Sequence, residues 1–284
     1  YNPDVQLAAL VDPLVDNDYV TKRSIGKSQA TLVGGTPVAA KDIYDIWCYE
    51  FTPKNYEKTI LLTSLIHGNE YTVFYWMTQF LDMLVNKWYE HPQLAYLRKN
   101  VRIVTVPIAN PYGHAVQTRE NINDVDLSRN FAYNWGTVFD EYNQGTAAWS
   151  ESESRAIRDL MAEIAPDCVA SLDFHTTTSE GATHYAIYYP RFLQNDISKY
   201  LGVVEALRQS GETTAFASTV IPTLTNWGIF THGFNAANPE FVNGLSGATR
   251  SSVEMTRCMK FFANFVFQAA KQPAKAKFTT IDSP

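Results

Sequence analysis

Cysteine is scarce in this sequence of 284 residues, which contains only Cys48, Cys168 and Cys258. Their number is odd and they lie far apart, whereas a disulfide framework or a cysteine metal site needs cysteines at regular, close spacings. Each of the three also stands among apolar neighbours, which is typical of buried thiols. We therefore interpret all three as free cysteines of the core.

Long basic runs and long apolar runs are missing as well. The formal net charge is -6, and no stretch of Lys or Arg could follow a phosphate backbone, which argues against nucleic acid as a partner. The apolar stretches, such as TVFYWM, are shorter than the roughly 20 residues that a bilayer requires. We expect a soluble protein with no membrane partner. It begins YNPD without an initiator methionine or a signal sequence, which leaves the compartment undecided and favours a processed, secreted or extracytoplasmic protein.

What the sequence does contain is an alternation of β-rich and helical segments. With 45% hydrophobic residues and no internal repeat, the chain can bury one large core, and we predict a single domain over residues 1–284. Composition predicts strands at 43–51, 59–66, 101–108, 168–174 and 183–190, and apolar spacing predicts helices at 73–88, 150–166 and 258–270. The expected fold is an α/β domain with a mixed, mostly parallel twisted sheet that is covered by helices on both faces.

The segment HGNE, residues 67–70, lies between a predicted strand and a predicted helix. Gly68 lets the chain bend there, so His67 and Glu70 can point to one spot, although Glu70 could equally be a simple helix cap. His175, in SLDFHTTT, leaves another predicted strand, at the same sheet edge if the two strands are parallel. Because a hydrolytic zinc site takes three protein ligands and leaves a position for water, His67, Glu70 and His175 form a candidate zinc site.

Further blocks extend this pattern along the chain. HGNE, IANPYG, TREN with DVDLSRNF, SESESRA, LDFHTTT and SVEMT follow one another in an order that resembles the zinc-dependent metallocarboxypeptidases of carboxypeptidase A type, over roughly residues 20–270. IGKS followed by DIYDIW also resembles the opening hairpin of that family. The HGNE and HTTTS forms are similar, in addition, to the aspartoacylase and succinylglutamate desuccinylase branch, which removes acyl groups from amino acids. The resemblance implies a zinc carboxypeptidase-like fold and one Zn²⁺ per chain, held by His67, Glu70 and His175.

The same resemblance implies roles for residues around the metal. Asp126 matches the carboxylate that orients the first zinc histidine, as metal-bound histidines usually require. Arg119 matches the arginine that stabilises the oxyanion, and Arg129 matches the one that holds the terminal carboxylate of a substrate, for which a planar guanidinium is well suited. Glu254, in SVEMT, matches the general base.

Two departures from the family pattern affect substrate recognition. Family members usually read DxNRNF, so Ser128 replaces an asparagine that shares carboxylate binding with the arginine, and we expect Ser128 to be a weaker substrate anchor. The family also places a capping tyrosine in a mobile loop about twenty residues before the catalytic glutamate, whereas this chain reads NWGIFTHGFNAANPE there. Trp227, His232 and Phe234 are the available replacements, with His232 expected to be a solvated loop residue.

These residues together indicate zinc-assisted hydrolysis of an amide bond. A metallocarboxypeptidase that removes C-terminal residues from peptides is the favoured function. An N-acyl amino acid amidohydrolase is the alternative, although such enzymes commonly need an added domain or lid that this chain has few residues left to build. A zinc-binding recognition protein without turnover is a third possibility, and it is disfavoured because Arg119 and Glu254 are both present.

Overall fold

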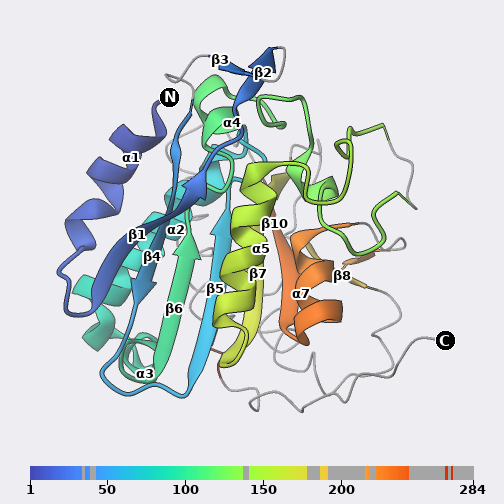
Figure 1. Ribbon diagram of the computed structural model, residues 1–284. Coiled ribbons are helices and arrows are strands. Elements are labelled where there is room, and N and C mark those ends of the chain that lie inside the picture. The colour runs from blue at the N-terminus through green and yellow to red at the C-terminus, as the bar shows by residue number, and fades with distance from the viewer. Residues whose placement is uncertain are drawn as a thin grey trace.

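A mixed β-sheet forms the centre of the fold (Figure 1). The computed structural model describes residues 1–33, 36–38, 43–136, 141–177, 186–190, 215–217, 222–242, 266, 267 and 270. Within these residues the sheet has eight strands in the order β1-β4-β6-β5-β7-β10-β8-β9. In chain order they are β1 (Val20–Lys27), β4 (Asp45–Phe51), β5 (Lys58–Ser64), β6 (Val101–Val106), β7 (Cys168–Thr177), β8 (Ala186–Pro190), β9 (Ala215–Ala217) and β10 (Asn235–Val242).

Strand direction changes across the sheet. The four central strands, β6, β5, β7 and β10, run parallel to one another. At one side β4 is antiparallel to β6, and β1 is antiparallel to β4. At the other side β8 is antiparallel to β10. The resemblance to an opening hairpin is confirmed because β1 pairs with β4, with Lys27 opposite Asp45. The short strands β2 (Thr31–Val33) and β3 (Thr36–Val38) form a ribbon between them in the chain. The predicted mixed sheet is therefore confirmed.

Helices cover both faces of the sheet, as predicted. The helices α1 (Pro3–Leu10), α2 (Tyr71–Asn86) and α3 (Pro92–Asn100) pack on one face, and α5 (Ser152–Ile164) and α7 (Leu224–His232) pack on the other, in front of the sheet in Figure 1. Neighbouring residues of β5 face opposite cores, since Ile60 and Leu62 contact the first group and Leu61 the second. This double burial explains why the central strands are apolar at successive positions.

Shorter helical segments connect these elements. They are α4 (Pro111–Val116) and the 3₁₀ turns η1 (Asp12–Leu14), η3 (Trp88–Glu90) and η4 (Leu127–Arg129). Among the described residues, no helix is both long and apolar enough to cross a membrane. The predicted helix at 258–270 lies mostly outside the described residues, of which 266, 267 and 270 are helical.

The segment NWGIFTHGFNAANPE, which we expected to be a loop, forms most of α7 and the first part of β10, so that expectation was wrong. The hydroxyl of Thr223 accepts a hydrogen bond from the backbone N–H of Asn226 (3.1 Å) and caps the start of α7. Gly233 ends this helix in the left-handed region, at φ 68°. The chain then enters β10, which pairs with β7 from Asn235 onward. The helix cap, the glycine and the long pairing with β7 together account for the helix and the strand in this segment.

Two of the three cysteines test the prediction of buried thiols. Cys48 and Cys168 are fully buried thiols. Burial raises the pKa of the Cys48 thiol to about 12, which makes it unreactive at neutral pH. Both are therefore packing residues, as expected, while Cys258 lies outside the described residues.

Candidate active site

His67 and Glu70 lie in the turn between β5 and α2, at the edge of the sheet where the parallel strands end. The backbone N–H of Glu70 donates to the carbonyl of His67 (3.2 Å), and Glu70 directly precedes the first residue of α2. Gly68 is required by close packing and not by the bend itself, because a Cβ atom there would come within 2.0 Å of the carbonyl carbon of Gly113. The tight turn brings the Nδ1 atom of His67 to 2.8 Å from Oε1 of Glu70.

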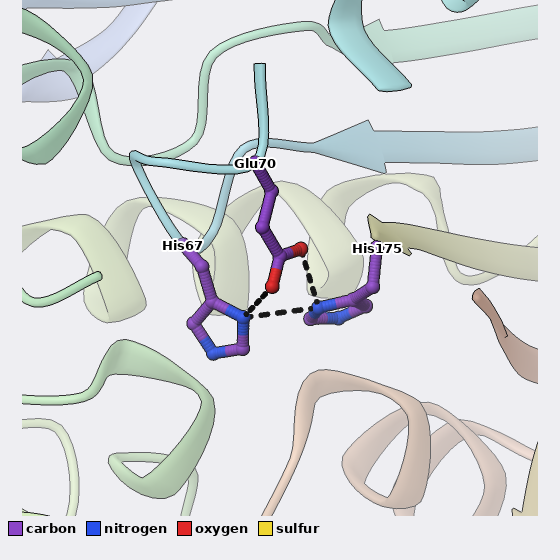
Figure 2. Close-up of side chains that lie close together, drawn as sticks. All are labelled: His67, Glu70 and His175. Atoms are coloured by element: carbon purple, nitrogen blue, oxygen red, sulfur yellow. Dashed lines mark hydrogen bonds and ion pairs between the residues drawn. The ribbon is translucent and has the colours of Figure 1, made fainter. Parts of the chain in front are cut away.

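His175 reaches the same spot from the adjacent strand, β7. Strand β7 continues through Thr177, so His175 lies within the strand, whereas the sequence predicted that it follows the strand's end. Continued pairing with β10, where Glu240 stands opposite His175, keeps this part extended. The Nδ1 atom of His175 lies 3.2 Å from Oε2 of Glu70 and 3.1 Å from Nδ1 of His67 (Figure 2).

The geometry of these three side chains fits a zinc ion. Zinc bound at 2.0–2.1 Å in a tetrahedron separates its ligand atoms by about 3.3 Å. The two Nδ1 atoms are 3.1 Å apart, and each lies near one oxygen of the Glu70 carboxylate, His67 at 2.8 Å from Oε1 and His175 at 3.2 Å from Oε2. The Nδ1 atoms of two imidazoles face one another, and a shared cation would satisfy both lone pairs. Among the described residues, His67, Glu70 and His175 are the only group of at least three potential ligands that converges in this way. All three are buried.

Burial and neighbouring charges act in opposite directions on the three candidate ligands. Burial disfavours the charged imidazole of His67, but the carboxylates of Glu70 and Asp126 outweigh it and raise the pKa of His67. The pKa of His175 is raised well above its usual value, because Asp173 and Glu70 likewise outweigh burial. Burial also disfavours the Glu70 carboxylate, yet both histidines hold the pKa of Glu70 far below its usual range. Glu70 is therefore ionised, which is the form that binds zinc.

A buried carboxylate stands behind each histidine. The Nε2 atom of His67 lies 3.2 Å from Oδ1 of Asp126, as the resemblance implied. The Nε2 atom of His175 lies 3.0 Å from Oδ2 of Asp173, whose other oxygen accepts a hydrogen bond from the hydroxyl of Thr63 (2.7 Å). Sequence reasoning missed Asp173. The signal was present in DFH, because residues two apart in a strand point to the same face.

Two arginines border the metal ligands. The Nε atom of Arg119 donates to Oδ2 of Asp126 (2.9 Å), and its Nη1 atom lies 3.9 Å from Oε1 of Glu70. The Nη1 atom of Arg129 donates to the hydroxyl of Ser128 (2.9 Å). The ring of Tyr142 makes cation–π contacts with both guanidinium groups, with its centroid 4.5 Å from Cζ of Arg119 and 5.2 Å from Cζ of Arg129. Tyr142 lies outside the motif blocks, so the sequence offered no signal for it.

The expected replacements for a capping tyrosine form an aromatic group on the α5 and α7 face. The ring of Trp227 packs edge-on against Trp149, with centroids 4.9 Å apart, and Phe234 is a core residue of that face. His232 stacks on Phe234, with ring centroids 5.2 Å apart. The expectation that His232 is a solvated loop residue was therefore wrong, because it ends α7 against an aromatic ring. Glu254, the expected general base, lies outside the described residues.

Comparison with known proteins identifies the same family as the motifs. The sequence model of a family described as zinc carboxypeptidase matches residues 36–262. A search of curated proteins finds no match.

Solved structures share the fold. The chain is similar to carboxypeptidase A from Helicoverpa armigera, at 18% sequence identity and a TM-score of 0.72, covering 94% of this chain and 72% of that one. It is also similar to bovine thrombin-activatable fibrinolysis inhibitor, at 17% identity and a TM-score of 0.71, covering 94% and 95% of the two chains. Similarity to the murein-tripeptide amidase MpaA from Escherichia coli O157 is weaker, with 19% identity, a TM-score of 0.54, and coverage of 86% and 91%. At these identities the likeness shows a common fold.

Proposed function

The chain belongs to the zinc carboxypeptidase family, and we propose that it removes the C-terminal residue of a peptide by hydrolysing its last peptide bond. The residues that would hold the family's single zinc are His67, Glu70 and His175. When bound, zinc supplies a Lewis acid that polarises a carbonyl and activates water. The remaining chemistry belongs to side chains of this chain.

Three residues divide that chemistry between them. Glu254 would take a proton from the attacking water on its carboxylate and deliver it to the leaving amine. Arg119, whose Nη1 atom lies 3.9 Å from a Glu70 oxygen, would stabilise the negative charge that develops on the scissile carbonyl oxygen. Arg129 would bind the terminal carboxylate of the peptide through its guanidinium group. The products are the shortened peptide and a free amino acid.

The observation that carries this proposal is the arginine pair beside the zinc ligands. Arg119 and Arg129 face the same Tyr142 ring, and each is linked to His67 through a single intervening residue, Asp126 or Ser128. One cation close to the metal and a second one nearby suit a substrate whose scissile carbonyl lies one residue before a free carboxylate. A guanidinium that can bind such a carboxylate is what distinguishes an exopeptidase from an internal amidase.

A substrate series with free and amidated C-termini tests the role of Arg129. If Arg129 forms a charge-assisted contact worth roughly 1.5 to 3 kcal/mol, kcat/KM should be about 10 to 150-fold higher on the free form. Arg129→Ala should abolish most of that preference. Arg158→Ala is the matched control, because Arg158 lies on α5 and pairs with its neighbour Asp159. It should keep the wild-type preference.

Each other outcome of the series points to another function. Equal wild-type rates on both forms would eliminate carboxylate recognition and with it exopeptidase activity. Turnover of N-acyl amino acids without turnover of peptides would identify a deacylase. Stoichiometric zinc without turnover of either class would identify a recognition protein.

A further inference from the structure

The hydroxyl of Ser128 lies at the junction between the zinc group and the arginines. Its Oγ atom lies 2.7 Å from Oδ1 of Asp126, 3.0 Å from Nε2 of His67 and 2.9 Å from Nη1 of Arg129. The side chain is buried, with 2% of the residue exposed. Ser128 stands where the family pattern has an asparagine that contacts substrate. Its hydroxyl contacts Asp126, His67 and Arg129 in this structure.

The capacity of a hydroxyl decides what Ser128 can do. A hydroxyl has one hydrogen to donate and two lone pairs to accept with. The hydroxyl donates its hydrogen to Oδ1 of Asp126, at 2.7 Å. Its lone pairs then accept from the Arg129 guanidinium and from the His67 Nε2–H group. No capacity remains for a substrate carboxylate.

The same assignment of hydrogen-bond donors and acceptors determines the orientation of the His67 ring. Oδ1 of Asp126 and the oxygen of Ser128 both act as acceptors toward Nε2 of His67, so this nitrogen carries the hydrogen. In the neutral imidazole that binds zinc, the Nδ1 atom then has the lone pair, and it faces Glu70 and His175, which is where zinc would bind. Partners of this kind fix the tautomer and ring orientation of histidine ligands.

We propose that Ser128 is a positioning residue that ties the zinc ligand His67 to the carboxylate-binding Arg129 through one hydroxyl, and that it does not contact the substrate. The role of Arg129 in this inference rests on the proposed function, whereas the link to His67 does not. A loss of the Ser128 hydroxyl therefore affects metal binding as well as peptide recognition. A direct substrate anchor would affect recognition alone.

Zinc affinity is the first readout, measured by competition with a chelator and independent of activity. Ser128→Ala should weaken zinc binding by about 10-fold or more, because outer partners of metal ligands typically contribute 10 to 100-fold. Ser128→Thr keeps the hydroxyl and should restore the affinity to within about threefold of wild type. Ser28→Ala is the control: Ser28 is also buried, and its hydroxyl accepts a hydrogen bond from the backbone of Tyr44, away from the zinc group. It should leave zinc affinity unchanged.

The second readout is the preference for free over amidated peptides, measured with saturating zinc. In the Arg129→Ala background, adding Ser128→Ala should leave this preference unchanged, because Ser128 acts through Arg129. A further drop in the preference, with zinc affinity of Ser128→Ala within about threefold of wild type, would overturn the proposal and make Ser128 a substrate anchor. Ser128→Gly removes the same hydroxyl and replaces the alanine variant if that variant does not fold. If the protein cleaves no peptide, the zinc measurements alone decide the link to His67.

Discussion

Asp173 is predicted to set the zinc affinity from the His175 side of the site. Its Oδ2 atom lies 3.0 Å from Nε2 of His175, and its Oδ1 atom accepts from the hydroxyl of Thr63 at 2.7 Å. Both contacts are buried, and the residue is 0% exposed, so water cannot replace the carboxylate. Removal of Asp173 therefore frees the His175 ring to rotate and leaves its N–H group without a charged acceptor.

Two substitutions separate the charge of Asp173 from its hydrogen bonds. Asp173→Asn can keep a carbonyl acceptor for His175 and loses only the charge, about 1 kcal/mol, so zinc affinity should fall roughly fivefold. Asp173→Ala removes the charge and the hydrogen bonds, and zinc affinity should fall by nearly 100-fold, at the upper end for outer partners of metal ligands. Chelator competition on folded, zinc-free protein measures both values.

Asp167→Asn provides a matched control for these variants. Asp167 accepts a hydrogen bond from the hydroxyl of Thr59 (3.0 Å), so the same pair of residue types joins β5 to the start of β7 at the other end of the strands, without a histidine. It should not change zinc affinity. An Asp173→Ala protein that is folded and binds zinc within about threefold of wild type would refute the reasoning.

Two further predictions concern the general base and a buried acid. Glu254→Gln should keep zinc and lose about 10² to 10⁴-fold in kcat, as measured on the best peptide substrate, and retention of turnover within threefold would mean that another residue is the base. Burial raises the pKa of Glu153 to about 7, above its usual 4.5, so the folded protein keeps a proton there that the unfolded chain has already released. Stability from this group is therefore present below about pH 4.5 and is lost as the pH rises to about 7. Glu153→Gln should remove that loss. The free energy of unfolding of the variant minus that of the wild type, measured in urea melts, should therefore be about 3 kcal/mol larger at pH 8 than at pH 4.5. An equal difference at both pH values would show that the Glu153 carboxyl has an ordinary pKa.

Much of the fold could be predicted because its signals are local. The strands at 43–51, 59–66 and 101–108 match β4, β5 and β6 within two residues at each end, since β-branched and aromatic runs mark buried strands. The turn at His67 and Glu70 was also local, and its motif identified the candidate zinc group. Strand β10 was missed because it forms by pairing with β7, which lies far away in the sequence.

The surroundings of the candidate zinc group were harder to predict than its ligands. A motif names residue types, but it does not state which atom each side chain faces. Ser128 was expected to face the substrate, and only the folded structure shows its hydroxyl among Asp126, His67 and Arg129. Tyr142 could not be found from the motifs, because it lies outside them and meets the two arginines only in the folded chain.

The two histidines of the candidate site are oriented by different parts of the chain, and a distortion of each part should have different consequences. His175 and Asp173 are two residues apart in β7, so the geometry of one strand fixes their relation. His67 depends instead on the meeting of two connections, its own turn and the η4 turn that carries Asp126 and Ser128. A distortion of β7 should therefore affect metal binding alone. A distortion of η4 should affect metal binding and both arginines together, because Asp126 also accepts from Arg119 and Ser128 also accepts from Arg129.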